Sequence, residues 1–247
     1  MITDYNRYQF TLRETITHVL KGISIIVIIG ILFYRNIIGI LLLSPLIYFY
    51  LKIKTKELIK IRRWKLNLEF RDGILALSAA LEAGYSAEHA FEEACRDLCQ
   101  IYPENSLIVR EFTYLIRQIK MNITVEKALS EFSERSGVED ILSFAEVFAT
   151  AKRTGGDLIK VIKTTSNMIS DKIEIKREIL TLITAKKLEA NLMKVIPLIM
   201  LVYLSVSSPG FLDPLYHNLY GILVMTVILI CYLGTYLIID KIIAIEV

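Results

Sequence analysis

LYGILVMTVILICYLGTYLII, the stretch from Leu219 to Ile239, carries no charged residue and decides the fold class. It reaches the roughly 20 residues of helix that span the hydrocarbon core of a bilayer. Three shorter apolar runs accompany it, at Val19 to Tyr34, Ile37 to Leu51 and Val195 to Val206. Because the runs form one pair toward each end of the sequence, we expect an all-α integral membrane protein with four transmembrane helices, two N-terminal and two C-terminal.

The first two runs meet at Arg35 and Asn36, and this junction allows two interpretations. One long helix would place Arg35 at the centre of the bilayer, at a cost of about 2.5–3.5 kcal/mol. A tight hairpin would place both residues at the far interface, where they are hydrated. We therefore expect a hairpin over residues 19–51. The third run is short, but the stem of Lys194 can reach toward the interface and upstream apolar residues can lengthen the helix.

Positively charged residues predict the orientation of these helices. Lys and Arg gather before the first run and after the second, and again before the third and after the fourth, whereas the loop 207–218 has none. By the positive-inside rule, both termini and the middle of the chain should be cytoplasmic, in a multi-pass protein of the inner or plasma membrane. The expected domains are a cytoplasmic N-terminal segment (1–18), a transmembrane hairpin (19–51), a cytoplasmic helical domain (52–194), a second transmembrane pair (195–239) with the short external loop 207–218, and a cytoplasmic tail (240–247).

The middle of the chain has the composition of an ordinary helical domain. Most of the 29 Lys and Arg and of the 26 Asp and Glu lie between Lys52 and Lys194. Apolar residues at helical spacing, separated by turn residues, predict a bundle of about six helices. The expected helices lie within residues 72–83, 87–101, 107–120, 125–136 and 139–153, and from 158 onward. The last has no helix breaker before Pro197, so we expect it to extend into the third apolar run.

Two turns between these helices are expected to have structural roles. Gly84 can adopt the positive φ that ends a helix, and Ser86 can cap the helix that follows. Gly155 and Gly156 form the second turn, after which Asp157 can cap the final helix. We therefore expect the two turns to set how the helices on either side of them are oriented.

The sequence lacks the residue patterns of common catalytic and cofactor sites. No GxxxxGK[ST] phosphate loop and no Ser-His-Asp grouping is recognisable. Cys95 and Cys99 lie four residues apart on one expected helix, but His89 falls off their face, so core packing explains them better than a metal site. We expect no enzymatic activity, no cofactor and no metal. The net charge of +3 also argues against nucleic-acid binding, which normally needs a concentrated cationic face.

Two groups of charged residues are candidates for contacts with another protein. Glu88, Glu92 and Glu93 lie near the positive N-terminal end of the expected helix 87–101. Lys152 and Arg153 lie at the negative C-terminal end of the helix 139–153. A solvated helix face is the simpler interpretation of both groups, and a docking surface is the alternative. No charge lies in the middle of an apolar run, which argues against an ion pump or a proton-coupled transporter.

Three motifs, in order between the two pairs of apolar runs, make the chain resemble the type II secretion system F-protein family. They are the AGYS turn at 83–86, the AL-x-x-F-x-x-R segment at 128–135 and the TGGDL turn at 154–158. The resemblance covers about Leu66 to Ile239, roughly two-thirds of the chain. It is strongest to the branch that assembles tight-adherence (Tad/Flp) pili.

This resemblance implies an inner-membrane platform protein that couples a hexameric cytoplasmic secretion ATPase to pilin-like subunits extracted from the bilayer. Many family members carry two copies of the domain, so a single copy implies assembly with a second copy or with a paralogous subunit. Other classes compatible with the topology are a membrane-anchored scaffold or signalling protein, a membrane-anchored enzyme and a small-molecule transporter. The groups proposed to face the ATPase, chosen for their expected exposure near turns, are Glu88, Glu92, Glu93, Lys152, Arg153 and Asp157.

Overall fold

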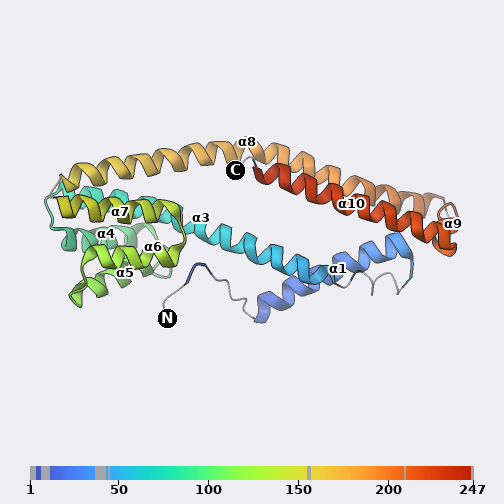
Figure 1. Ribbon diagram of the computed structural model, residues 1–247, viewed down its shortest axis with the longest axis horizontal. Coiled ribbons are helices and arrows are strands. Elements are labelled where there is room, and N and C mark those ends of the chain that lie inside the picture. The colour runs from blue at the N-terminus through green and yellow to red at the C-terminus, as the bar shows by residue number, and fades with distance from the viewer. Residues whose placement is uncertain are drawn as a thin grey trace. The chain divides into compact units, whose positions relative to one another are not determined.

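The computed structural model describes residues 4–6, 12–36, 43, 45–154, 157–208 and 210–245. The described residues are almost all helical and include no β-strand (Figure 1), which confirms the all-α fold. The helices are α1 (Leu12–Tyr34), α3 (Leu46–Glu82), α4 (Ala87–Ile101), α5 (Leu107–Lys120), α6 (Val125–Ser136), α7 (Glu139–Thr154), α8 (Leu158–Ser207), α9 (Asp213–His217) and α10 (Leu219–Ile245).

The chain forms two compact units. The bundle unit consists of residues Met1–Gln9 and Thr55–Ile175, and the apolar unit consists of Phe10–Lys54 and Lys176–Val247. The bundle unit therefore ends earlier than the expected domain 52–194. The expected N-terminal segment 1–18 is divided, with its first part in the bundle unit and the rest in the apolar unit. Two helices, α3 and α8, contribute residues to both units.

The long helix α3 includes the end of the second apolar run and the expected helix 72–83, which the sequence indicated as separate segments. It begins at Leu46, in the second apolar run, and continues without interruption to Glu82. The stretch between them, LKIKTKELIKIRRWK at residues 51–65, contains no Gly or Pro and is rich in Lys, Arg and Leu, which are strong helix formers. The helix α8 likewise runs from Leu158 to Ser207 and passes through Pro197, which confirms its expected extension into the third apolar run.

Phenylalanine rings form the centre of the bundle unit. Phe70 of α3 makes edge-on contacts with Phe132 of α6 and Phe144 of α7, with ring centroids 6.1 and 5.6 Å apart. The ring centroid of Phe91 of α4 lies 5.6 Å from that of Phe112 of α5. All five rings are almost fully buried. Aromatic pairs of this kind add to the stabilisation from buried area, so they hold α3 through α7 around one core.

Local sequence accounts for the limits of the bundle helices. The helices α4 and α5 begin and end at the predicted residues, and α6 ends before Gly137, whose φ of +59° is left-handed. A Schellman motif ends α3: the backbone N–H of Gly84 donates to Leu81 O at 3.0 Å and that of Tyr85 donates to Ala80 O at 3.3 Å. These bonds satisfy carbonyl groups that the end of a helix leaves without partners.

Three helices in the described part of the chain are long and apolar enough to cross a membrane. They are Glu14–Tyr34, Leu158–Ser207 and Tyr220–Ile239. Four were expected from the sequence; in the remaining run, Ile37–Leu51, seven of the fifteen residues (37–42 and 44) lie outside the described residues. Ile26 and Phe33 of α1 pack in one cluster with buried residues of α10, which forms the core of the apolar unit.

Two turns of the apolar unit meet at one end of α1. Arg35, directly after α1, forms an ion pair with Asp213 at the start of α9, with Nη1 and Oδ1 3.1 Å apart. Its guanidinium carbon also lies 5.7 Å from the ring centroid of Tyr216, whose hydroxyl donates to the backbone carbonyl of Leu32 at 2.7 Å. An ion pair therefore connects the junction of the first two apolar runs to the loop 207–218, which carries no Lys or Arg.

Candidate partner interface

Most of the charged residues proposed to face a partner already bind other parts of the chain. Glu92 of α4 pairs with Lys120 at the end of α5, with Oε1 and Nζ 2.9 Å apart. Glu93 pairs with Arg96 on its own helix at 2.9 Å. Lys152 of α7 pairs across to Glu126 of α6 at 3.1 Å. The first pair links α4 to α5 and the third links α6 to α7. None of the three pairs joins the acidic group to Lys152 or Arg153.

Asp157 has a local structural role at the start of α8. Its Oδ1 accepts a hydrogen bond from the backbone N–H of Lys160 at 3.0 Å, so it caps the helix as the sequence suggested. The adjacent turn residues Gly155 and Gly156 lie outside the described residues. At the other predicted turn, Gly84 has a φ of +91° and an open surrounding, and Ser86 Oγ accepts from the backbone N–H of His89 at 3.4 Å.

Glu88 and Arg153 are the two members of the proposed set whose side chains have neither an ion pair nor a capping hydrogen bond among the described residues. Both side chains are exposed. Among the described residues neither has an ion-pair partner, unlike Glu92, Glu93 and Lys152. A charge that is exposed and unpaired can bind an oppositely charged partner without first breaking an internal pair. The six residues stay a prediction, and Glu88 and Arg153 are the two that we select for a test.

The ion pairs also shift the acidity of their carboxylates. The hydrogen bond and charge of Lys120, reinforced by His89, hold the pKa of Glu92 below its ordinary value. Burial would raise the pKa of Glu126, but hydrogen bonds from its own backbone N–H and from Lys152 outweigh burial and lower it. Both groups are therefore ionised at neutral pH and act as fixed negative charges.

A buried polar network at the end of α6 was missed by the sequence analysis. Glu111 of α5 is buried and accepts hydrogen bonds from Arg135 Nη1 and Nη2 at 3.2 and 2.8 Å, and from the hydroxyl of Tyr5 at 2.9 Å. Burial would lower the pKa of Arg135, but Glu111 outweighs it and the pKa is raised. The burial of Glu111 could have been predicted from helical spacing. Glu111 lies three residues after Ile108 and four before Leu115, so it lies on the same buried face of α5.

A second buried network joins α3, α7 and α8. Asp140 of α7 is buried and accepts from Asn67 Nδ2 of α3 at 2.7 Å and from Lys172 Nζ of α8 at 2.6 Å. A buried carboxylate without partners would cost several kcal/mol, and these two contacts give the carboxylate of Asp140 its hydrogen-bond donors. The network holds the first part of α8 in the bundle unit.

Of the two cysteines expected to pack in the core, Cys95 does so and Cys99 does not. Cys95 is buried, its Sγ lies 3.8 Å from Thr113 Oγ1, and burial raises the pKa of its thiol. Cys99 and Cys231 are exposed. In the part of the chain that the structure describes, no group of three or more His, Cys, Asp or Glu is arranged to hold a metal ion.

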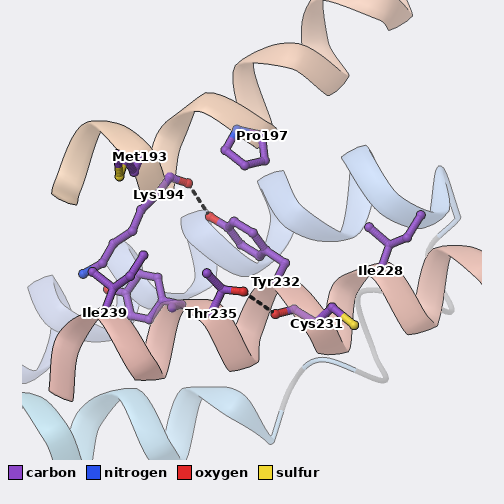
Figure 2. A pocket seen from close by; sticks show the side chains of 9 residues that line it. Met193, Lys194, Pro197, Ile228, Cys231, Tyr232, Thr235 and Ile239 are labelled. Carbon is purple, nitrogen blue, oxygen red and sulfur yellow. Dashed lines mark hydrogen bonds between the residues drawn. The ribbon is translucent and has the colours of Figure 1, made fainter. Parts of the chain in front are cut away.

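The apolar unit contains a half-open cavity of about 290 Å³ between α8 and α10 (Figure 2). Lys194 of α8 lies at its edge, with Nζ 4.4 Å from the ring centroid of Tyr236. The hydroxyl of Tyr232 donates to the backbone carbonyl of Lys194 at 2.8 Å, and Thr235 Oγ1 donates to Cys231 O at 2.9 Å. The cavity wall is thus mostly apolar, and the hydroxyl groups of Tyr232 and Thr235 donate their hydrogen bonds to backbone carbonyls of the chain.

The sequence matches the model of one protein family. The family whose sequence model matches the chain is described as type II secretion system (T2SS), protein F, and the match covers residues 74–206, from α3 to α8. No significant match to a curated protein is found. No solved structure matches significantly either. Because the family match includes more than half of the 247 residues, the chain belongs to the type II secretion system protein F family.

Proposed function

We propose that this protein is the inner-membrane platform of a type IV or Tad-type pilus or of a type II secretion-like machine, where it couples a hexameric cytoplasmic ATPase to the assembly of pilin-like subunits. Family membership supports the general part of this statement, since proteins of the family are structural platforms of secretion or pilus machinery and not enzymes. Its three apolar helices are in keeping with an inner-membrane protein.

The observation that carries the proposal is the continuity of α3 and α8. Each is a single helix that begins in one unit and ends in the other. In the bundle unit α8 is held by the buried Asp140 and Lys172 contact and by buried residues such as Ile162 and Ile169. A force applied to the bundle unit would therefore act on helices that extend into apolar segments without an intervening loop.

The Arg35–Asp213 pair supports the proposed topology. Positive charges assign the junction at Arg35 and the loop 207–218 to the far side of the membrane, and the ion pair joins these two segments. We therefore propose a multi-pass protein with both termini and the bundle unit in the cytoplasm, in which Ile37–Leu51 supplies the fourth span.

Crosslinking in the native cell tests the proposal directly. The tagged protein would be purified in mild detergent after crosslinking, and its companions identified by mass spectrometry. A secretion-type ATPase and small pilin-like proteins are the expected companions, together with a second platform copy or a paralogue. Recovery of none of these, with metabolic enzymes or a bound small molecule instead, would contradict the platform function.

A charge-reversal pair tests the proposed docking residues. We expect Glu88→Lys combined with Arg153→Glu to reduce copurification of the ATPase roughly ten-fold, since each reversal turns a complementary charge into a like charge at the interface. The thermal midpoint of the bundle unit should stay unchanged, because substitutions at exposed residues usually alter stability by less than about 0.5 kcal/mol. Glu104→Lys, an exposed acidic residue outside the set, is the matched control. Equal loss in the control would remove the assignment.

A further inference from the structure

The segment Asp4–Asn6, here called the strap, is anchored deep in the bundle unit by one side chain. Tyr5 is 1% exposed and is among the largest fully buried side chains, whereas Asp4 and Asn6 on either side are exposed. The strap is distant in sequence from everything it contacts. A single buried aromatic residue between two exposed residues is the pattern of a short peptide docked into a pocket.

The pocket that holds Tyr5, here called the socket, is formed by Arg62 of α3, Glu111 of α5, and Arg135 and Gly137 at the end of α6. The hydroxyl of Tyr5 donates to Glu111 Oε1 at 2.9 Å. The guanidinium carbon of Arg62 lies 5.0 Å from the centroid of the Tyr5 ring, within range of a cation–π interaction. Burial, followed by the charge of Glu111, raises the pKa of the phenol, so it remains a proton donor. The socket thus recognises both the ring and the hydroxyl of a tyrosine.

The backbone of the strap also satisfies the end of α6. The N–H of Tyr5 donates to Arg135 O at 3.0 Å, and Asn6 Nδ2 donates to Glu134 O at 3.1 Å. These carbonyls lie in the last turn of the helix, where no intrahelical donor remains. Gly137 leaves the room that the strap needs, since a Cβ there would collide with the side chain of Asn6. The socket therefore offers backbone acceptors as well as a side-chain pocket.

Part of the socket wall is also held by contacts that do not involve the strap. Arg135 is held by Glu111 and by Glu131, whose Oε1 lies 3.3 Å from Arg135 Nε. Its guanidinium carbon also lies 5.3 Å from the ring centroid of Tyr114. Because these contacts lie within α5 and α6, we expect Arg135 and Glu111 to stay in place when the strap is removed and to be available to another peptide.

We propose that the socket is a peptide-binding site for an extended segment carrying a tyrosine, and that the chain's own strap occupies it reversibly. The inference does not rest on the proposed function, because its test measures peptide binding alone.

Peptide binding to the full-length protein tests the proposal. The probe is a fluorescent synthetic peptide of residues 1–9, MITDYNRYQ, and the readout is fluorescence anisotropy with detergent-purified protein. Wild-type protein should bind it at least ten-fold more weakly than Tyr5→Ala, whose socket is vacant. A probe with Phe at position 5 should bind Tyr5→Ala roughly ten-fold more weakly, because it lacks the hydrogen bond to the carboxylate. Tyr85→Ala, which removes an exposed tyrosine, should behave like wild type.

Several outcomes would overturn the inference. Equal binding by wild type and Tyr5→Ala would mean that the strap does not occupy the socket, and binding by neither would mean that no peptide site exists. Insensitivity of Tyr5→Ala to a further Glu111→Gln change would place the peptide elsewhere.

A crosslinking variant keeps the test valid if Tyr5→Ala does not fold. A photoreactive phenylalanine at Tyr5 should crosslink to α5 or α6 within one chain. A crosslinked dimer, an adduct outside the socket or no adduct would contradict occupation by the chain's own strap.

Discussion

Replacement of Glu111 or Arg135 tests how the buried network contributes to stability. Side-chain exposure is 6% for Glu111 and 15% for Arg135, so either charge is costly once its partner is removed. In Glu111→Met, Arg135 loses its buried partner and keeps the more exposed Glu131. In Arg135→Met, Glu111 keeps only the hydroxyl of Tyr5. Breaking a buried pair costs about 3–5 kcal/mol, and the remaining contacts lower our expectation to about 2–4 kcal/mol for each single variant.

The double variant distinguishes this explanation from simple loss of packing. With both charges replaced by methionine no charge is stranded, so we expect a net cost of only about 0–2 kcal/mol. The coupling between the two sites should then exceed about 2 kcal/mol. For a domain of this size, 1 kcal/mol corresponds to roughly 3–5 °C in the thermal midpoint. Each single variant should therefore melt roughly 6–20 °C below wild type, and the double variant no more than about 10 °C below it and above both single variants.

Trp64 provides the assay in the full-length chain. It is the one tryptophan of the sequence, and it packs against the core of the bundle unit. Its fluorescence during heating therefore reports unfolding of that unit without a tryptophan signal from the apolar unit. Additive losses in the double variant would refute the reasoning, because they would show that the two side chains stabilise the bundle independently.

Three further predictions use the same fluorescence assay. Gly73→Ala should lower stability by about 1–2 kcal/mol despite the better helix propensity of alanine, since its Cβ would lie 2.9 Å from the buried ring of Phe112 in α5. A stabilised variant would contradict this prediction. Lys172→Met should lower stability by about 1–3 kcal/mol, because it removes one of the partners of the buried Asp140. Lys163→Met, which breaks the exposed pair with Glu82, should lower it by less than about 1 kcal/mol. Equal losses would argue against the buried network. Burial and then Asp72 raise the pKa of Tyr102 from 10.0 to about 12. The contribution of Tyr102 to the free energy of unfolding is therefore present below pH 10 and is lost between pH 10 and 12. Tyr102→Phe should lose less stability than wild type over that interval, and identical pH profiles would count against the assignment.

Helix limits were predictable from the sequence because they depend on neighbouring residues. Ser86 is next to the helix it caps, and Gly137 ends α6 through its own φ. The uninterrupted path of α3 from Leu46 was not predicted, because the change from apolar to basic composition near Lys52 was taken as a boundary. Lysine and arginine form helices as readily as leucine does, so a change in polarity need not end a helix.

The candidate interface was only partly predictable for a related reason. Exposure of Glu88 follows from helical spacing, but the partners of Glu92 and Lys152 lie on other helices. The charge of a residue shows that it can form an ion pair and does not show with which residue. The same reasoning explains why six charged residues of similar appearance in the sequence have different roles in the structure.

The sequence by itself determined the all-helical fold, the apolar ends and the family, since all three are set by composition, local periodicity and short motifs. Only the tertiary structure decided that Tyr5 is a core residue. Its carboxylate partner, Glu111, is 106 positions away, and the carbonyl that its backbone binds belongs to Arg135. Contacts over such separations depend on how the helices pack and leave no periodic pattern near Tyr5, so no local rule could reveal the strap or its socket.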